Sequence, residues 1–228
     1  MNNMNHNRKL LLSALKRFGA GIALLGLFLF LCAGDIRYWN AWLYLAAFSA
    51  AIFSFGTVLY AKDKELLRKR LNTKEKEAAQ KAYVFFTSLT FLAVFGLCGL
   101  DYRFGWSRVP FAAVIVALAV MLAGYGLFVL TMKQNRFASR VVEIQNEQKV
   151  IDTGVYSVIR HPMYAAAITM FFASPIVLGS FYAVIPMLFY CIGIVLRIRN
   201  EETVLQNGLD GYAEYMKKVK YRLIPFVW

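Results

Sequence analysis

The sequence predicts an all-α protein that crosses a membrane about six times, including a C-terminal helical hairpin, and carries further helices at the cytoplasmic interface. Of its 228 residues, 59% are hydrophobic and only 17% are charged, a composition too apolar for an ordinary soluble domain. The apolar residues gather in long stretches without charge, and the basic residues gather in alternate connections between them. Cysteine and histidine are too few and too scattered for a metal site built from those ligands.

Charge-poor stretches in residues 1–132 predict an N-terminal region of four transmembrane spans. They cover residues 18–33, 41–60, 82–100 and 109–132. Their lengths approach the roughly 20 apolar residues that a spanning helix needs. The first stretch follows a basic segment, as in a signal peptide. Because the later stretches are equally apolar, we predict a first transmembrane helix instead.

Two features of this region bear on how its helices pack. Residues 62–81 are dense in charge of both signs and carry a thin apolar stripe of leucines. This pattern predicts a surface helix lying against anionic headgroups, with a solvated connector as the alternative. Gly124 and Gly126 lie near the end of the fourth stretch, where small residues predict the close approach of another helix.

Residues 133–228 form the second predicted region. After a long polar connection, residues 162–178 and 182–196 predict a tight helical hairpin that turns at Gly179. Both arms are short for a full span, so the sequence leaves open whether the hairpin crosses the bilayer completely. Past Gly208, an apolar face on a basic segment predicts a short interfacial helix.

The basic residues predict the orientation of the chain. All but three of the 26 Lys and Arg residues lie in the N-terminal segment, in alternate connections and in the C-terminal segment. The exceptions are Arg37, Arg103 and Arg108. Basic residues concentrate in the cytoplasmic connections of membrane proteins, so both termini are predicted to be cytoplasmic. The net charge of +13 is thereby explained by topology and needs no nucleic-acid partner.

The first arm of the hairpin opens with Arg160, His161 and Pro162. Proline suits the first position of a helix, which makes His161 the predicted N-cap. Basic side chains beside the positive end of a helix dipole are unfavourable unless an anion joins them, and helix N-termini bind anions readily. The segment therefore predicts either a bound phosphate or carboxylate, or simply the cytoplasmic end of a span with a capping histidine.

A second cluster runs from Arg197 to Glu202, at the end of the other arm. Arg197 precedes Glu201 by one helical turn and Arg199 precedes Glu202 similarly, so both pairs can form within one helix. Alternatively, one carboxylate faces a polar cavity and binds a cation or a diol, since charged groups at membrane depth often mark sites. Antiparallel arms bring this cluster beside Arg160 at the cytoplasmic interface, where the two would suit a zwitterionic, nucleoside-bearing ligand.

Several motifs follow one another in this region. They are Gly154-x-Tyr156-x-x-x-Arg160-His161-Pro162-x-Tyr164, then Arg199-x-Glu201-Glu202, Tyr212-x-x-Tyr215 and Arg222-Leu-Ile-Pro225. In this order they resemble the isoprenylcysteine carboxyl methyltransferase family and the related membrane phospholipid methyltransferases. The resemblance covers about residues 145–228. One departure is Ala166, where the family usually has glycine, and its methyl group is expected to narrow the approach of a cofactor.

The resemblance implies an integral membrane enzyme that binds S-adenosylmethionine at the cytoplasmic side, so that residues 133–228 form a cofactor-binding catalytic region. The cofactor-binding residues that it implies are Gly154, Tyr156, Arg160, His161, Pro162, Tyr164, Glu201, Glu202, Tyr212 and Tyr215. Glu201 and Glu202 would supply an acidic contact, and with Arg199 they are the implied catalytic residues. Arg199 would hold or orient the carboxylate of an acceptor.

The expected acceptor is lipophilic and enters sideways between helices from the membrane lipids. It is either a carboxylate, as in isoprenylcysteine, or a lipid headgroup. A carboxylate is ionised at pH 7 and needs no general base, whereas an amine needs a base such as a glutamate to take its proton. The protein would contribute alignment and charge placement.

Two other classes of protein remain as alternatives. The NADPH-dependent membrane sterol reductases and steroid 5-alpha-reductase-like proteins have an ending similar to residues 221–225. The phosphates of NADPH, however, call for more convergent basic side chains than Arg160, Arg197 and Arg199 provide. A catalytically silent membrane scaffold would bind neither cofactor.

Overall fold

The computed structural model describes residues 2–71, 78–135, 137, 144–145 and 147–228. Its helices are α1 (Asn2–Ala33), α2 (Trp39–Lys62), α3 (Lys64–Leu71), α4 (Ala78–Phe104), α5 (Phe111–Gln134), the short 3₁₀ helix η1 (Gly154–Ser157), α6 (Pro162–Val177), α7 (Val184–Gly208) and α8 (Tyr212–Lys218). These ranges contain no strand. The predicted all-α class is confirmed.

Helices long and apolar enough to cross a membrane account for the N-terminal region. They are α2, α5 and the greater part of α1 and α4, and they correspond to the predicted spans. α6 is apolar but has only 16 residues, and the second half of α7 carries several charged residues. The helices therefore support an integral membrane protein with at least these four candidate spans among the described residues.

The end of α4 differs from the prediction, which placed residues 101–108 in a loop. The helix continues for a further turn and ends at Gly105, whose φ of +65° suits the left-handed position after a helix. Asp101 stays helical because its buried carboxylate accepts hydrogen bonds from the hydroxyl groups of Ser107 and Ser180, at 2.6 and 2.5 Å. A charge that is paired inside the protein does not mark a helix end.

The surface helix predicted over residues 62–81 is shorter than expected. Residues 72–77 lie outside the described ranges, and α4 has begun by Ala78. Leu66 and Leu67 of α3 are buried against the cytoplasm-predicted ends of α1 and α2. The apolar stripe therefore packs against protein, which explains why a short helix suffices.

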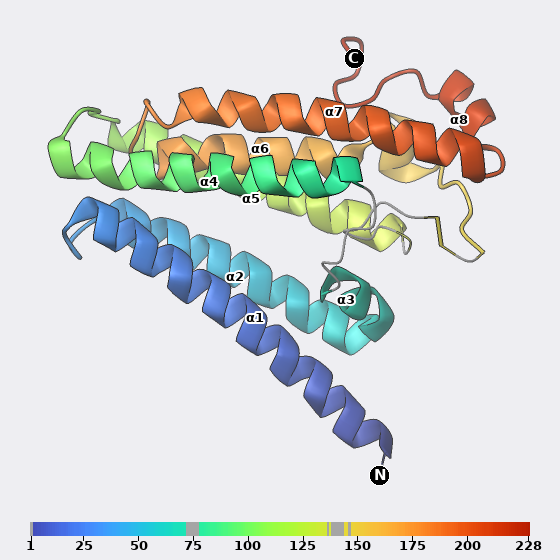
Figure 1. Cartoon of the computed structure of the whole chain (residues 1–228), viewed down its shortest axis with the longest axis horizontal. Helices are drawn as coiled ribbons and strands as arrows, with labels where there is room; N and C mark the ends of the chain where they lie inside the picture. The colour runs from blue at the N-terminus through green and yellow to red at the C-terminus, as the bar shows by residue number, and fades with distance from the viewer. Residues whose placement is uncertain (1, 72–77, 136, 138–143, 146) are drawn as a thin grey trace.

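The apolar helices form one bundle, from which the α1–α2 hairpin diverges toward the N-terminus (Figure 1). α5 lies closely along α6 because Gly124 of α5 has no side chain. A Cβ at Gly124 would lie 2.8 Å from the backbone nitrogen of Met170 on α6, so the predicted close packing is confirmed there. Open space surrounds the corresponding position at Gly126, and for that residue the prediction is wrong.

α7 runs to Gly208 rather than ending near residue 196 as predicted. Arg197 and Glu202 thus lie within the helix and are buried. Glu202 therefore lies away from the C-terminal end of the helix, where the dipole would disfavour a carboxylate. The prediction failed because charged residues were taken to end the helix, whereas here they face other parts of the protein.

Both ends of the chain lie toward the same end of the bundle as α3 and α8 (Figure 1). The opposite end holds the α1–α2, α4–α5 and α6–α7 connections, close to Arg37, Arg103 and Arg108. This arrangement is the alternation that the basic residues predicted.

Candidate active site

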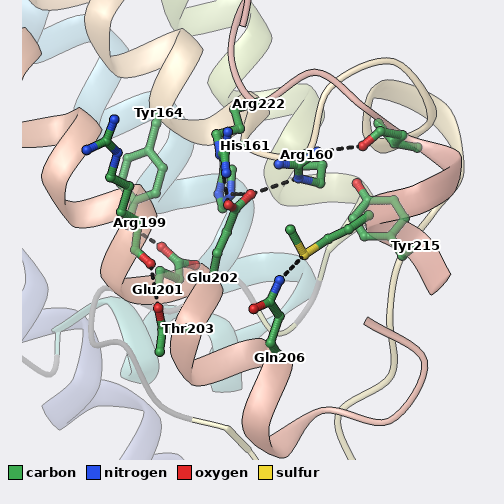
Figure 2. Close-up of polar contacts among 12 residues, drawn as sticks. Arg160, His161, Tyr164, Arg199, Glu201, Glu202, Thr203, Gln206, Tyr215 and Arg222 are labelled. Carbon is green, nitrogen blue, oxygen red and sulfur yellow. Dashed lines mark hydrogen bonds and ion pairs between the residues drawn. The ribbon is translucent and has the colours of Figure 1, made fainter. Parts of the chain in front are cut away.

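The α6–α7 hairpin brings the two predicted clusters together, as Figure 2 shows. Arg160 Nε lies 2.7 Å from Glu202 Oε1, and Arg222 Nε lies 2.8 Å from Oε2 of the same carboxylate. His161 Nε2 lies 3.2 Å from Glu202 Oε1. Because an ionised carboxylate only accepts hydrogen bonds, this nitrogen carries the hydrogen. Glu202 is 4% exposed, so three donors converge on a buried anion.

The C-terminal segment holds Arg160 and His161 in place. Their backbone N–H groups donate to the carbonyl groups of Tyr221 and Arg222, both at 2.9 Å. The Arg160 guanidinium also donates to the carbonyl groups of residues 219 and 220, at 2.7 and 2.9 Å. The start of α6 is therefore tied to the chain beyond α8 through both backbone and side chain.

The electrostatics of Glu202 follow from these contacts. Burial raises the pKa of its carboxyl group, but hydrogen bonds from His161, Arg160 and Arg222 outweigh burial and hold the pKa at about 2, below its ordinary value of 4.5. Glu202 is therefore an anion at neutral pH. With both oxygens engaged, it acts as the counter-ion of two arginines.

The sequence predicted that an anion could bind beside the start of α6. In the structure the carboxylate of Glu202 occupies this place. His161 is the N-cap, as predicted, and Pro162 occupies the first turn. The His161 side chain makes no capping hydrogen bond and turns to Glu202 instead. The Arg160 guanidinium therefore finds its acceptors, Glu202 and the carbonyl groups of residues 219 and 220, within the chain.

Glu201 takes part in a different set of contacts, since adjacent residues on a helix point about 100° apart. Tyr164 Oη donates to Glu201 Oε2 at 2.5 Å and accepts a hydrogen bond from Arg197 Nε at 2.9 Å. The Arg197 guanidinium lies over the ring of Tyr83, 4.7 Å from its centroid. We call Glu201, Tyr164 and Arg197 the tyrosine relay. It links α6 to α7 across the hairpin.

A cavity of about 100 Å³ lies between η1, the start of α6, the second half of α7 and α8. The predicted cofactor-binding residues that line it are Tyr156, Arg160, His161, Pro162, Tyr164, Glu201, Tyr212 and Tyr215. Residues 148–151 and the apolar side chains of Val204 and Leu205 complete its wall. We call this space the hairpin cavity.

Tyrosine hydroxyl groups give the hairpin cavity its polarity. Tyr215 Oη donates to the Tyr156 carbonyl at 2.7 Å, and Tyr156 Oη accepts from Asn135 Nδ2 at 3.1 Å. Tyr212 Oη is buried and has no hydrogen-bond partner in the described part of the chain. Burial raises the pKa of Tyr156 to about 12 and that of Tyr212 well above its ordinary value. Tyr212 is therefore a protonated donor without an acceptor.

Three predicted site residues do not line the hairpin cavity. Gly154 begins η1 with a φ of +58°, and the Gln134 side chain fills the space that a Cβ would need, so this glycine shapes the turn. Glu202 lies behind the cavity wall. Arg199 is exposed and does not join the cluster. Glu202 pairs with Arg160 and Arg222 instead of with Arg199.

Ala166 lies apart from the hairpin cavity. Ala166 is fully buried and does not line the hairpin cavity. Its carbonyl oxygen lies where a Cβ at Gly124 would approach within 3.1 Å. The residue therefore belongs to the α5–α6 contact, and its methyl group does not narrow the cavity.

Sequence reasoning missed the roles of Arg222, Arg197 and Asn135. Arg222 belongs to the last motif. The only sign of its role in the sequence was its position as a single basic residue before two apolar residues. For Arg197 the sequence predicted only a pair with Glu201 within its own helix, and it gave no sign of the contact with Tyr164 across the hairpin. Asn135 lies in a polar connection whose pattern does not distinguish it.

Comparison with known proteins agrees with this geometry. Residues 112–210 match the sequence model of a family described as phospholipid methyltransferase. The match contains nearly all of α5, all of η1, α6 and α7, and hence the tyrosine relay, Arg160, His161 and Glu202. No curated protein matches the chain. Residues 112–210 are thus similar to the phospholipid methyltransferases, and the resemblance that the motifs predicted is confirmed over this part of the chain.

Proposed function

We propose that this protein is a membrane methyltransferase, that it uses S-adenosylmethionine as its methyl donor and that it acts on a lipophilic acceptor. The observation that carries the proposal is the hairpin cavity. It places a carboxylate, a hydroxyl group that has no hydrogen-bond partner among the described residues, and several aromatic rings in one space beside the apolar bundle.

The residues of the hairpin cavity fit the chemistry of this cofactor. When bound, it supplies a methyl group already activated by a sulfonium. Glu201 offers negative charge to the cationic part of the cofactor, and the rings of Tyr156 and Tyr215 suit a cation or a stacked base. Tyr212 Oη offers a hydrogen bond to an oxygen or nitrogen of the ligand. The cavity therefore provides complementary groups for a nucleoside and for a cation.

Binding requires the cavity to widen, since about 100 Å³ is less than the roughly 300–1,000 Å³ of ordinary ligand pockets. α8 and the segment before η1 cover the space. An exposed ion pair, Lys218 Nζ to Asp152 Oδ2 at 2.7 Å, joins them. Such surface pairs contribute little free energy, so we propose that α8 moves outward to admit the cofactor.

The remaining site residues position the wall. Glu202 holds Arg160 and His161, and Tyr164 orients Glu201. Arg199 stays a proposed contact for the acceptor on the resemblance of its motif alone.

No finding supports the NADPH-dependent alternative. Among the described residues, the cations that line the cavity are Arg160, whose guanidinium is already engaged by Glu202, and the exposed Lys149, a poor match for several phosphates.

The side of the membrane follows from the basic residues. The hairpin cavity lies at the end of the bundle that carries most of them, together with both chain ends. By the preference of basic connections for the cytoplasm, we propose that the termini and the active site are cytoplasmic.

Calorimetric titration of the detergent-purified protein with S-adenosylhomocysteine, and separately with NADPH, tests this function. We expect saturable binding of S-adenosylhomocysteine alone. Glu201→Gln removes the charge of the carboxylate, and we expect it to weaken binding by about tenfold or more. Thr203→Val, on the exposed face of α7, is the matched control and should bind as the parent does. NADPH binding would contradict the proposal, as would equal affinity in Glu201→Gln and the parent.

A further inference from the structure

The apolar face of the α8 region does not reach the surface of the molecule. Tyr212 and Tyr215 of α8 are buried in one cluster with Leu209 and Val219, and Val150 packs against them. From this face the sequence predicted a helix at the membrane interface, but in the structure the face contacts other parts of the protein. Any contact of this region with membrane lipid must therefore be made by other side chains.

Residues 224–227, which follow α8, expose a group of apolar side chains. The exposed fractions are 56% for Ile224, 86% for Phe226 and 75% for Val227. The residues on either side are anchored, because Leu223 belongs to the main core cluster and Trp228 packs against it. Residues 224–227 therefore project outward between two fixed points. We call them the apolar loop.

Backbone hydrogen bonds give the apolar loop a fixed shape. The Ile224 carbonyl accepts the N–H groups of Val227 and Trp228, at 3.2 and 3.1 Å. The main-chain oxygen of Trp228 in turn accepts those of residues 222, 223 and 224, at 2.9, 2.9 and 3.1 Å. Phe226 has a φ of +64°, a turn position that glycine or asparagine usually occupies. The loop therefore holds a bulky apolar side chain outward where a turn in water would carry a small or polar one.

The apolar loop lies at the side of the bundle. After α8 the chain turns back along α7 and ends beside that helix rather than beyond its end (Figure 1). The contacts agree with this view, since Arg222 pairs with Glu202 of α7 and Leu223 shares a core cluster with Ile198 of α7. The bundle contains at least four candidate membrane spans, so its side faces lipid. The loop is therefore placed to meet lipid near the end of the bundle that carries most of the basic residues.

Basic side chains accompany the apolar loop. Residues 212–228 contain four basic residues and one acidic residue, Glu214. Two of the basic residues pair with carboxylates of the chain, and the other two, Lys217 and Lys220, are exposed. A surface that joins apolar and basic side chains suits an anionic leaflet. A second copy of the chain would instead bring like charges together.

We propose that the apolar loop inserts into the anionic leaflet at the basic end of the bundle, with Lys217 and Lys220 at the lipid phosphates. Insertion removes the exposed apolar side chains of the loop from water, which is favourable. This role belongs to the free protein and does not depend on the proposed cofactor or acceptor.

The insertion also bears on the hairpin cavity. Arg222, two residues before the apolar loop, holds Glu202. The Tyr221 carbonyl accepts the backbone N–H of Arg160. The inserted loop thereby anchors to the membrane the segment that supports the wall of the cavity.

Quenching of tryptophan fluorescence by brominated lipid tests the insertion. The probe is Phe226→Trp in the full-length protein, reconstituted into nanodiscs of phosphatidylcholine and phosphatidylglycerol with bromine on the acyl chains of one lipid or the other. We expect the emission that Phe226→Trp adds to that of the parent to be quenched, and roughly threefold or more strongly by the brominated anionic lipid. Emission that neither lipid quenches, as beneath a second protein, would overturn the proposal. Equal quenching by the two lipids would overturn the anionic leaflet.

Further variants locate the contact. Asn207→Trp, at an exposed position near the end of α7, is the matched control, and its added emission should not be quenched. Equal quenching at both positions would overturn the apolar loop as the point of insertion. In the Phe226→Trp background, Lys217→Gln together with Lys220→Gln should abolish the preference for the anionic lipid, while thermal unfolding confirms that the variant is folded. A preference that survives both substitutions would overturn the role of the two lysines.

Thermal unfolding in the same nanodiscs gives a second test, whose sign depends on the surroundings of the apolar loop. The φ of +64° at Phe226 suits asparagine, so in water Phe226→Asn would leave the melting temperature unchanged or raise it. An inserted loop loses apolar burial in this variant, and we expect the melting temperature to fall. Phe226→Leu also lacks the ring that lies 5.3 Å from that of Tyr221, but it stays apolar and should melt close to the parent. A melting temperature of Phe226→Asn at or above that of the parent would overturn the insertion, as would an equal fall in Phe226→Leu.

Discussion

Arg160 Nε lies 2.7 Å from Glu202 Oε1, and this buried ion pair joins the start of α6 to the second half of α7. Arg222 completes the pair from the C-terminal segment, with its Nε 2.8 Å from Glu202 Oε2. Three parts of the chain that are distant in sequence therefore meet at one carboxylate. The wall of the hairpin cavity depends on this meeting point.

Glu202→Gln is expected to destabilise the protein strongly. The amide leaves two arginines and His161 without their anion, and loss of one partner of a buried ion pair costs about 3–5 kcal/mol. Thermal unfolding of the detergent-purified variant measures the loss. Asp152→Asn breaks the exposed pair with Lys218 and, as the control, should leave the melting temperature nearly unchanged. Equal melting temperatures for Glu202→Gln and the parent would contradict the counter-ion role.

The pH dependence of stability follows from the pKa of Glu202, which falls from 4.5 to about 2 in the folded protein. The unfolded chain binds this proton more tightly, so acid favours unfolding. The contribution of Glu202 is fully present above about pH 4.5 and is lost as the pH falls toward 2. The difference in melting temperature between the parent and Glu202→Gln should be constant from pH 5 to 8 and shrink below that window. A difference that changes between pH 6 and 8 would assign the effect to another group.

Tyr212→Phe and Tyr215→Phe form a matched pair with opposite expectations. Tyr212 Oη has no partner in the described structure, so its removal should leave the stability of the free protein unchanged or raise it. It should weaken S-adenosylhomocysteine binding by about fivefold or more, because the hydroxyl is proposed to bind the ligand. Tyr215→Phe loses a hydrogen bond to the Tyr156 carbonyl and should cost about 1 kcal/mol of stability. Thermal unfolding measures the stability of both variants, and calorimetry measures their affinity for S-adenosylhomocysteine.

Tyr164→Phe removes the centre of the tyrosine relay without changing the shape of the side chain. Arg197 Nε and Glu201 Oε2 each lose a partner, which should cost about 1–3 kcal/mol of stability. Because Tyr164 orients Glu201 in the wall of the hairpin cavity, we also expect a lower rate of methyl transfer at saturating substrates. An unchanged rate at saturation would remove Tyr164 from the positioning machinery.

Gly124→Ala tests the packing of α5 on α6. Its Cβ would lie 2.8 Å from the backbone nitrogen of Met170, and backbone atoms cannot move aside cheaply. Overpacking of this kind costs about 1–3 kcal/mol. Gly126→Ala meets open space and should be neutral or slightly stabilising, since alanine favours helices. Similar melting temperatures for both variants would show that α5 and α6 can move apart at little cost in stability.

Much of the fold was predictable, because long apolar stretches predict membrane-spanning helices and basic connections predict the side of the membrane on which each connection lies. The errors arose at charged residues. Asp101 and Glu202 were taken to lie at or beyond helix ends, yet both are buried and paired within the bundle. Composition shows that a charge is present, but it does not show whether a partner from elsewhere in the chain removes it from solvent.

The candidate site was predictable to the extent that it depends on the hairpin. Two antiparallel arms bring Arg160 and His161 beside Glu201 and Glu202, whichever way each side chain points. The sequence did not show which carboxylate would be the counter-ion. That depends on Arg222, which reaches the site through an irregular C-terminal segment without periodicity, and on the rotation of α7, which turns Glu201 toward Tyr164.

Transfer of a radiolabelled methyl group is the most direct test of the central claim. The purified protein is incubated with methyl-labelled S-adenosylmethionine and membrane lipids, and the label in the organic extract is treated with mild base. We predict that label enters the lipid fraction and that Glu201→Gln transfers far less. Base releases the label as methanol from a methyl ester and leaves it on a methylated amine, so this step identifies the acceptor. Absence of label from the lipid fraction would contradict the methyltransferase itself.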